Sequence, residues 1–277
     1  METEFNTTPR GEMESQLHFS YSQLSTFLIC PAKYGHQYVF GTPPETKPVA
    51  LSFGKAIHKA AETYYCTLKD TGEIVTVDQV IATFEMVFDN DIKSTEVELT
   101  LKEGETLGAL REQGIELIKL FHKEIRPQKI AGVEVPFSVS VPDILNGGGD
   151  LAIKLVGYYD LVERDDQGTY LIAELKTSAQ RFSSLRLEYD LQATTYSYAM
   201  TRMKVATSEN GCLVRFDVLL KLKKPAFDHY FVTRNEGDYQ RLIHLINHVL
   251  RAIELRVFYR NTGWQCGDCQ FKKACFA

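Results

Sequence analysis

The sequence predicts an α/β protein with a mixed central β-sheet flanked by helices. Three observations support this fold class. Apolar residues recur at helical spacing through the front third of the chain. From position 133 they alternate with polar residues, which is the period of a strand with one buried face. The predicted elements then follow in the order strand, strand, strand, helix, strand, an order typical of a mixed sheet covered by helices.

The front of the chain is expected to be mostly helical over 19–126, after a polar, disordered stretch at 1–18. A short helix should begin near Ser22, whose hydroxyl can cap it, and should stop at Cys30 before a proline. Three prolines at 43–48 predict an irregular connection. Longer helices are expected at 52–65, 78–97 and 105–125.

The sheet is expected in the region 127–260, followed by a cysteine-rich tail at 261–277, with the whole forming one integrated domain. The glycine run at 147–149 resembles a phosphate cradle, but no predicted helix follows it, so a hairpin turn is the favoured interpretation. Strands are predicted at 133–141, 151–163, 170–176, 212–222 and 229–233, and helices at 187–203 and 237–259.

The composition is that of an ordinary globular protein, with 44% apolar and 24% charged residues. A net charge of −5 gives no global basic field, so a polyanionic partner must be held locally or through bound metal. Because there is no long apolar run and no secretory signal, we expect a cytoplasmic protein with no membrane partner. Six cysteines in a reducing compartment favour metal binding over disulfides.

Three ionisable residues lie within unusually apolar predicted strands: Asp160 in one, Glu174 and Lys176 in the next. Such groups are costly to bury unless they are paired or bind a cation. Glu174 and Lys176 are two residues apart and so share one face of their strand. A tight hairpin could bring Asp160 beside Glu174, where a divalent cation would remove the repulsion between the two carboxylates.

Hard oxygen ligands suit Mg²⁺ or Mn²⁺, either of which can activate water against a phosphodiester. Lys176 would then position the attacking water. The plainer interpretation is a structural Glu174–Lys176 pair on an exposed strand face, and Asp…Glu-x-Lys alone does not exclude it.

Four cysteines form the second distinctive pattern. Cys30 stands near the front of the chain, whereas Cys266, Cys269 and Cys275 are crowded into the tail. If one inorganic centre held all four, it would close a very long loop, for which cross-link entropy gives on the order of 4–5 kcal/mol. The lone distant cysteine is unlike the two close pairs of most zinc sites, although spacing does not separate zinc from iron–sulfur.

Several segments taken together resemble the PD-(D/E)xK nuclease superfamily, and in particular its RecB-like branch, over most of the chain. They occur in the family's order: Ser20-Tyr21-Ser22-Gln23-Leu24 through Cys30-Pro31-Ala32-Lys33-Tyr34, then Gly54-Lys55-Ala56-Ile57-His58, Glu134-Val135-Pro136-Phe137, Gly157 to Asp160, Glu174-Leu175-Lys176-Thr177-Ser178, and Gln192 with Tyr196.

The resemblance implies a restriction-endonuclease-like core and assigns roles to residues. Asp160, Glu174 and the Leu175 carbonyl would bind metal, His58 would add a ligand, and Lys176 would serve the attacking water. Gln192 and Tyr196 share one helix face and would contact the DNA backbone and help to place Lys176. For Glu134 two interpretations stay open, a metal-site carboxylate and a solvated edge residue. The family often has Asp where Glu174 stands.

The cysteine pattern is similar to the iron–sulfur site of AddB-type subunits and CRISPR-associated adaptation exonucleases. By that resemblance, Cys30, Cys266, Cys269 and Cys275 would hold a [4Fe–4S] cluster. Trp264 is expected to shield this centre. Cys66 and Cys212 are expected to be small buried apolar residues.

The function that these patterns predict is a metal-dependent DNA nuclease, and the resemblance implies an exonuclease on single-stranded ends with a helicase or CRISPR integrase as a partner. Two other classes stay open: a non-catalytic DNA-end-binding or scaffold subunit, and a zinc-binding nucleic-acid module. A few basic residues converging on the metal would suffice to neutralise phosphates, and the others are solvated surface; the candidates near the proposed site are Lys55, Lys59, Arg181, Arg186, Arg215, Lys221, Lys223 and Lys224.

Overall fold

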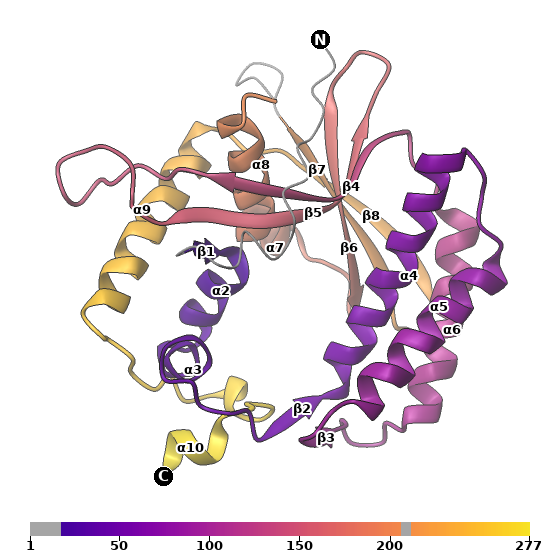
Figure 1. Ribbon diagram of the computed structural model, residues 1–277, viewed down its shortest axis with the longest axis horizontal. Helices are drawn as coiled ribbons and strands as arrows, with labels where there is room; N and C mark the ends of the chain where they lie inside the picture. Colours follow the sequence, from indigo (N-terminus) through magenta and orange to yellow (C-terminus); the bar gives the residue numbers. More distant parts are fainter. Residues whose placement is uncertain (1–17, 206–211) are drawn as a thin grey trace.

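The predicted fold class is confirmed by the computed structural model, which describes residues 18–205 and 212–277 (Figure 1). A mixed sheet lies at the centre with helices on both faces. The expected disorder at 1–18 lies outside the described residues except for His18, which begins strand β1 (His18–Ser20) instead. Within the described ranges, no helix combines the length and apolar character needed to cross a bilayer.

The six-stranded sheet has the order β1-β5-β6-β7-β8, with β4 paired to β5. β5 is antiparallel to both of its long neighbours, β4 and β6. β1 runs parallel to β5, and β7 runs parallel to β6. The strands are β4 (Lys129–Val139), β5 (Lys154–Arg164), β6 (Tyr170–Ser178), β7 (Leu213–Leu220) and β8 (Ala226–Val232).

Strand β5 has two different neighbours along one edge. Its residues 154–156 pair with β1, and its residues 161–164 pair with β6. On its other edge, β4 accompanies it over nearly its whole length. The sheet therefore opens between β1 and β6 beside residues 157–160, and β6 continues past this opening paired only to β7.

Gly157 allows a close contact at the start of this opening. A Cβ on Gly157 would lie 2.5 Å from the ring of Phe137 on β4, so no larger residue fits without moving that ring. Phe137 in turn stacks on Tyr159 with a centroid distance of 4.8 Å. The glycine thus lets an aromatic cluster support the strand at the point where its pairing changes.

Three long helices cover one face of the sheet: α4 (Val49–Thr71), α5 (Val77–Lys93) and α6 (Leu107–Glu124) (Figure 1). Their buried side chains include Phe53, Phe84 and Phe121, which belong to a core shared with Leu175 of β6. α5 begins with a capping box at Thr76 and ends four residues earlier than predicted.

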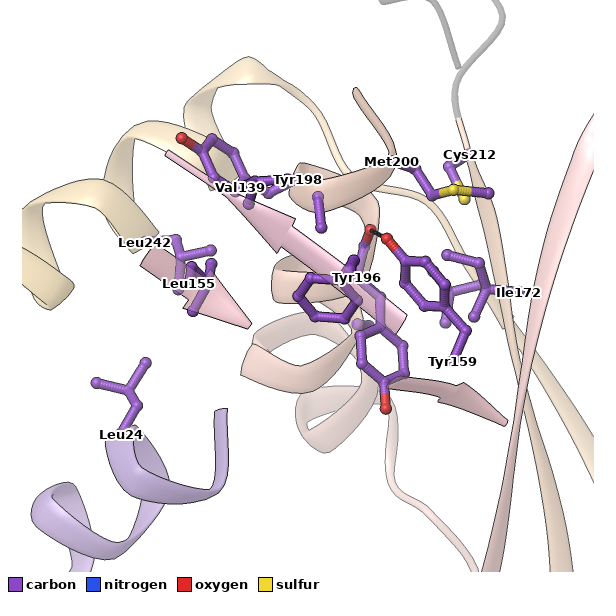
Figure 2. Close-up of a cluster of buried hydrophobic side chains, with 14 of the residues drawn as sticks. Leu24, Val139, Leu155, Tyr159, Ile172, Tyr196, Tyr198, Met200, Cys212 and Leu242 are labelled. Atoms are coloured by element: carbon purple, nitrogen blue, oxygen red, sulfur yellow. Dashed lines mark hydrogen bonds between the residues drawn. The ribbon is translucent and has the colours of Figure 1, made fainter. Parts of the chain in front are cut away.

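The other face is covered by α2 (Tyr21–Ile29), α8 (Leu191–Arg202) and α9 (Glu236–Glu254). Figure 2 shows Tyr159 and Tyr196 in this second core, where the Tyr159 hydroxyl donates to the Tyr196 carbonyl at 3.4 Å. The helix predicted at 187–203 is in fact two, α7 (Ser184–Tyr189) and α8. Asp190 separates them because its side chain caps α8, accepting from the Ala193 amide.

The connection predicted to be irregular contains β2 (Thr46–Pro48), which pairs in parallel with β3 (Glu98–Thr100). Around it lie the short helices α3 (Pro31–Tyr34), η1 (Gly35–Val39), η2 (Trp264–Cys266) and α10 (Lys272–Phe276). The predicted glycine turn is confirmed, since Gly147, Gly148 and Gly149 all have positive φ between β4 and β5.

The tail lies against the front of the chain, and backbone hydrogen bonds tie the two together. The Ala32 amide donates to the Tyr259 carbonyl at 3.0 Å, and the Glu45 amide donates to the Gln270 carbonyl at 2.8 Å. The Glu45 carboxylate accepts from the Ala274 amide at 2.8 Å, and this bond lowers the pKa of Glu45. Two distant segments are thus held together before any contribution from cysteine is considered.

Candidate active site and cysteine pocket

Asp160 and Glu174 face each other at the opening of the sheet. The β5–β6 ladder ends at the pair Leu161↔Ala173, so the next residues along each strand are Asp160 and Glu174. In place of the ladder, Asp160 Oδ2 accepts a hydrogen bond from the Leu175 amide at 2.9 Å. The predicted hairpin is therefore present, and it brings the two carboxylates together.

Glu174 is buried and fully engaged by polar neighbours. Its Oε1 accepts from Lys176 Nζ at 2.6 Å and from Gln192 Nε2 at 2.7 Å, while the Tyr196 hydroxyl donates to Oε2 at 3.0 Å. Gln192 also donates to the Tyr196 hydroxyl at 2.9 Å. Because both residues come from one face of α8, the helix side chains and the strand carboxylate form a single cluster.

His58 reaches the same place from α4, on the opposite face of the sheet. Its Nδ1 lies 3.3 Å from Asp160 Oδ2. Burial alone would lower the pKa of His58, but the negative charge and hydrogen bond of Asp160 raise it. The imidazole and the carboxylate therefore stabilise each other's charged forms.

Burial favours the neutral form of both carboxylates, yet their pKa values shift in opposite directions because their charged neighbours differ. Burial would raise the pKa of Asp160, but His58 outweighs it, and the pKa of Asp160 falls. The pKa of Glu174 rises, because burial and the charge of Asp160 both disfavour a second negative charge there. Burial would lower the pKa of Lys176, whereas Glu174 raises it, so Lys176 is held as an ammonium.

Glu134 has an unusual backbone at this site. It lies on β4 between the pairs Val133↔Leu161 and Val135↔Tyr159, and hence opposite Asp160. Its φ of 49° is in the left-handed region, which a non-glycine residue adopts at a cost of about 1–3 kcal/mol. Glu134 is also only half-buried. The register thus places Glu134 beside Asp160, and its role as a metal-site carboxylate or an edge residue stays a prediction.

The donor set suits a small hard cation, although no three His, Cys, Asp or Glu side chains among the described residues already form a metal-ligand group. Asp160 and Glu174 supply carboxylate oxygens from adjacent strands, and the raised pKa of Glu174 reports the repulsion between them. A divalent cation between two such groups would relieve that repulsion. The residues therefore fit Mg²⁺ or Mn²⁺.

The four cysteines of the sequence pattern line one small pocket, together with Arg260. Cys30 is buried at the end of α2, and the three tail cysteines are half-buried. The pKa of Cys275 is raised by burial and by the nearby charges of the other three sulfurs. The structure thus brings together, from the two extremes of the chain, the residues that were predicted to act as one centre.

Trp264 does not shield this pocket, contrary to prediction. Its side chain is 85% exposed, and it is absent from the pocket lining. Cys212 is buried beneath α8 as predicted, and burial raises the pKa of its thiol to about 12. Cys66 is only half-buried on α4.

Four of the basic residues considered for DNA contact pair with carboxylates. Lys59 binds Glu62 at 2.6 Å and Arg181 binds Asp228 at 2.9 Å, both near the surface. Arg215 is buried, and its guanidinium binds Glu163 at 2.6 Å and Asp217 at 2.7 Å. Lys55 binds Asp91 at 2.6 Å. Arg215 was mispredicted because its position on an interior strand is not evident from its neighbours in the sequence. Its role is within the fold and not at a DNA surface.

Tyr21 belongs to the site but was not predicted as a site residue. Burial raises the pKa of its phenol, and the charges of Asp190, Lys176 and Glu174 act on it, which places it beside the catalytic cluster. The sequence held one signal, the position of Tyr21 in the opening motif. Its proximity to Lys176 depends on how α2 crosses the sheet.

An aspartate and a Glu-x-Lys segment on adjacent strands, at the point where a mixed sheet opens, define a site of the nuclease class. A profile of the PD-(D/E)XK nuclease superfamily matches residues 18–276, and the chain belongs to that superfamily. Its members generally use divalent metals such as Mg²⁺. Comparison with curated protein sequences gave no match.

Solved structures agree with the fold. A crystal structure from Eubacterium rectale, described as "Putative exonuclease", has a TM-score of 0.52 at 15% sequence identity and covers 96% of this chain and 92% of its own. A second structure, SSO0001, covers 92% of this chain and 94% of its own at 12% identity, with a TM-score of 0.38. The first likeness supports the fold alone, and the second is too low to support an inference.

Proposed function

We propose that this chain is a divalent-metal-dependent deoxyribonuclease of the RecB-like branch, which hydrolyses phosphodiester bonds at single-stranded ends. One observation carries the proposal. At the opening of the sheet, Asp160 accepts the Leu175 amide while Glu174, buried with a raised pKa, binds Lys176. A purely structural pair would not need a second carboxylate whose charge opposes that of the first.

Asp160, Glu174, the Leu175 carbonyl and His58 would hold the metal, with Glu134 beside them. When bound, Mg²⁺ or Mn²⁺ would polarise a phosphate oxygen and lower the pKa of a water molecule. Lys176, kept protonated by Glu174, would orient that water and offset charge on the phosphate as it is attacked. Gln192 and Tyr196 would hold Glu174 in place through their hydrogen bonds.

The test is a digestion of end-labelled single-stranded and double-stranded DNA over a titration of Mg²⁺ and Mn²⁺. Metal-dependent loss of the terminal label from the single strand is the expected result, and Asp160→Asn should remove it. If wild-type protein binds DNA ends yet leaves them intact at every metal concentration, the alternative applies, a non-catalytic end-binding or scaffold subunit.

We also propose that Cys30, Cys266, Cys269 and Cys275 hold a [4Fe–4S] cluster. The support is their convergence on one pocket and the mutual effect of their sulfurs on the pKa of Cys275. Four thiolates suit an iron–sulfur cluster and also zinc. The cluster would reinforce the backbone hydrogen bonds that already join the tail to the segment 31–45.

Protein purified without oxygen separates the two metals. A brown colour, with iron and acid-labile sulfide near four atoms per chain, is the expected result, and Cys275→Ser should diminish both. The matched control is Cys212→Ser, which alters a cysteine buried elsewhere. Colourless protein with stoichiometric zinc would establish the zinc alternative instead.

A further inference from the structure

A groove adjoins the catalytic cluster on the side away from His58. It has a volume of about 320 Å³, at the lower end of the range for small-ligand pockets. Gln192 and Tyr196 line it, and both also bind Glu174. The groove therefore shares a wall with the catalytic carboxylate.

The lining of the groove is aromatic and hydroxylic. Of the described residues that line it, none is Asp, Glu, Lys or Arg, and His18 is the one ionisable side chain besides the tyrosines. Tyr21, Tyr158 and Phe137 contribute rings, and Ser20 and Ser22 contribute hydroxyls 2.9 Å apart at the start of α2. Ring faces and neutral hydrogen-bonding groups suit a nucleobase and its sugar better than a phosphate.

Tyr21 connects this lining to the reaction centre. It is the first residue of α2, and the charges of Lys176 and Glu174 both act on its phenol. Tyr21 also lines the groove together with Gln192 and Tyr196, the two residues that bind Glu174, so it lies at the end of the groove nearest the carboxylate cluster. A nucleotide whose phosphate lay at Lys176 would extend its sugar and base past Tyr21.

The geometry points to a subsite in this groove for the unpaired nucleotide next to the scissile phosphate, with Tyr21 as the stacking residue. This assignment rests on the proposed nuclease activity and adds the element that selects an unpaired end. A duplex would present that base already hydrogen-bonded to its partner. The groove, which is the size of one small ligand, would then have to accept a base pair.

The experiment compares single-stranded oligonucleotides that carry either a normal or an abasic nucleotide at each end in turn. Stacking of one base is worth about 1–3 kcal/mol, or roughly 5- to 150-fold. Wild-type protein should therefore cleave the normal end about tenfold more efficiently, by kcat/KM, than the abasic one. Tyr21→Ala should lower kcat/KM on the normal end to its own value on the abasic end, whereas Tyr21→Phe should retain the preference.

Tyr189→Ala is the matched control, because Tyr189 is an exposed tyrosine outside the groove. It should behave as wild type. Retained preference in Tyr21→Ala would overturn the subsite. An equal loss on both substrates would also overturn it, because Tyr21 would then act through Lys176 and not on the base. Tyr21→Leu, which keeps the apolar bulk in α2, guards against misfolding and should match Tyr21→Ala.

Failure of the proposed nuclease activity would look different, since wild-type protein would then cleave neither substrate. In that case fluorescence anisotropy with Ca²⁺ and the same oligonucleotides still tests the groove. Tighter binding of the normal end, abolished in Tyr21→Ala, would support the subsite. Equal binding of both ends by wild-type protein would refute it.

Discussion

Two clusters of buried charge lie on neighbouring strands of one sheet, yet they are built differently. The catalytic cluster centres on Asp160, Glu174 and Lys176, and the second cluster centres on Glu163 and Arg215. Glu163 follows Asp160 by three residues on β5, and Arg215 is paired in register with Ala173, the neighbour of Glu174. Sequence position alone therefore does not distinguish them.

The second cluster is closed. Arg215 donates to Glu163 at 2.6 Å and to both oxygens of Asp217, at 2.7 and 2.9 Å. The other Glu163 oxygen accepts from the Gln128 amide, and His229 lies 2.6 Å from Asp217. Burial would lower the pKa of Arg215, but its two carboxylates raise it. Every carboxylate of this cluster thus has a donor positioned for it.

The catalytic cluster is open by comparison. Glu174 keeps a raised pKa despite three hydrogen bonds, and the cluster borders a groove. The repulsion between Asp160 and Glu174 therefore persists beside an open groove, an arrangement that is common at functional sites. The comparison teaches that unrelieved repulsion beside a cavity, and not burial of charge as such, indicates function.

The largest expected effect separates the two clusters by activity. Lys176→Ala should reduce DNA cleavage by about 10²- to 10³-fold, the usual cost of removing one positioned group that stabilises developing charge. The midpoint of thermal unfolding of the Lys176→Ala protein should change less than that of an Arg215 variant. Rates on end-labelled DNA and calorimetry measure the two quantities, with Lys119→Ala, in an exposed pair, as control. Wild-type rates in Lys176→Ala would refute the assigned centre.

The converse variant should affect stability. Arg215→Met leaves Glu163 and Asp217 buried without their donor, which should lower the free energy of unfolding by about 3–5 kcal/mol. Arg111→Met is a matched control, because Arg111 also bridges two carboxylates, Glu85 and Asp89, but near the surface. Its loss should be about 1 kcal/mol or less in denaturant titrations. Equal losses would show that the second cluster is not closed as described.

A smaller effect is expected from the hydroxyl that supports Glu174. Tyr196→Phe removes its donor to Oε2 and should weaken metal affinity about 10- to 100-fold, as measured by Mn²⁺ titration. Tyr198→Phe is the control on the same helix, because the Tyr198 hydroxyl donates instead to the Ser140 carbonyl. Equal metal affinity in the two variants would contradict a role for Tyr196 at the site.

The smallest effect concerns pH. Without metal, the pKa of Glu174 in the folded protein is above its ordinary value of 4.5. The protonated carboxyl therefore stabilises the fold at low pH, and this stabilisation is lost as pH rises through the folded-state pKa. Because Mg²⁺ binds the ionised carboxylate, stabilisation by Mg²⁺ should appear as pH rises through the same folded-state pKa. At ten times the Kd it amounts to about 1.4 kcal/mol. Thermal unfolding with and without Mg²⁺ across pH measures it, and a pH-independent increment would contradict it.

Much of the sheet could be predicted because strand periodicity is local. The alternation at 133–141 overlaps the observed β4, and the apolar run at 170–176 lies within β6. β2 and β3 could not be predicted, since three-residue strands carry no periodic signal and β2 ends in proline. The break at Asp190 was missed because the apolar residues keep helical spacing on both sides of it. Only the structure shows that Asp190 ends one helix and caps the next.

The candidate site was predicted from charge in apolar surroundings, a signal that Asp160 and Glu174 both give. The structure brings these residues together, while their roles in metal binding stay predictions. Arg215 gave a similar signal and was assigned to the wrong function, because only its partners show that its charge is satisfied. Tyr21 was missed because it is far from Lys176 in the sequence, and only the packing of α2 shows that the two residues are neighbours.

The bonds between the tail and the segment 31–45 have a consequence for synthesis of the chain. On the ribosome, the strands that carry Asp160 and Glu174 emerge well before residues 259–275, and N-terminal parts generally fold first. Until the later residues emerge, Cys30 and the carboxylate of Glu45 have no partners from the tail. Each newly made molecule therefore passes through a stage in which its front segment lacks the hydrogen bonds that later join it to the tail.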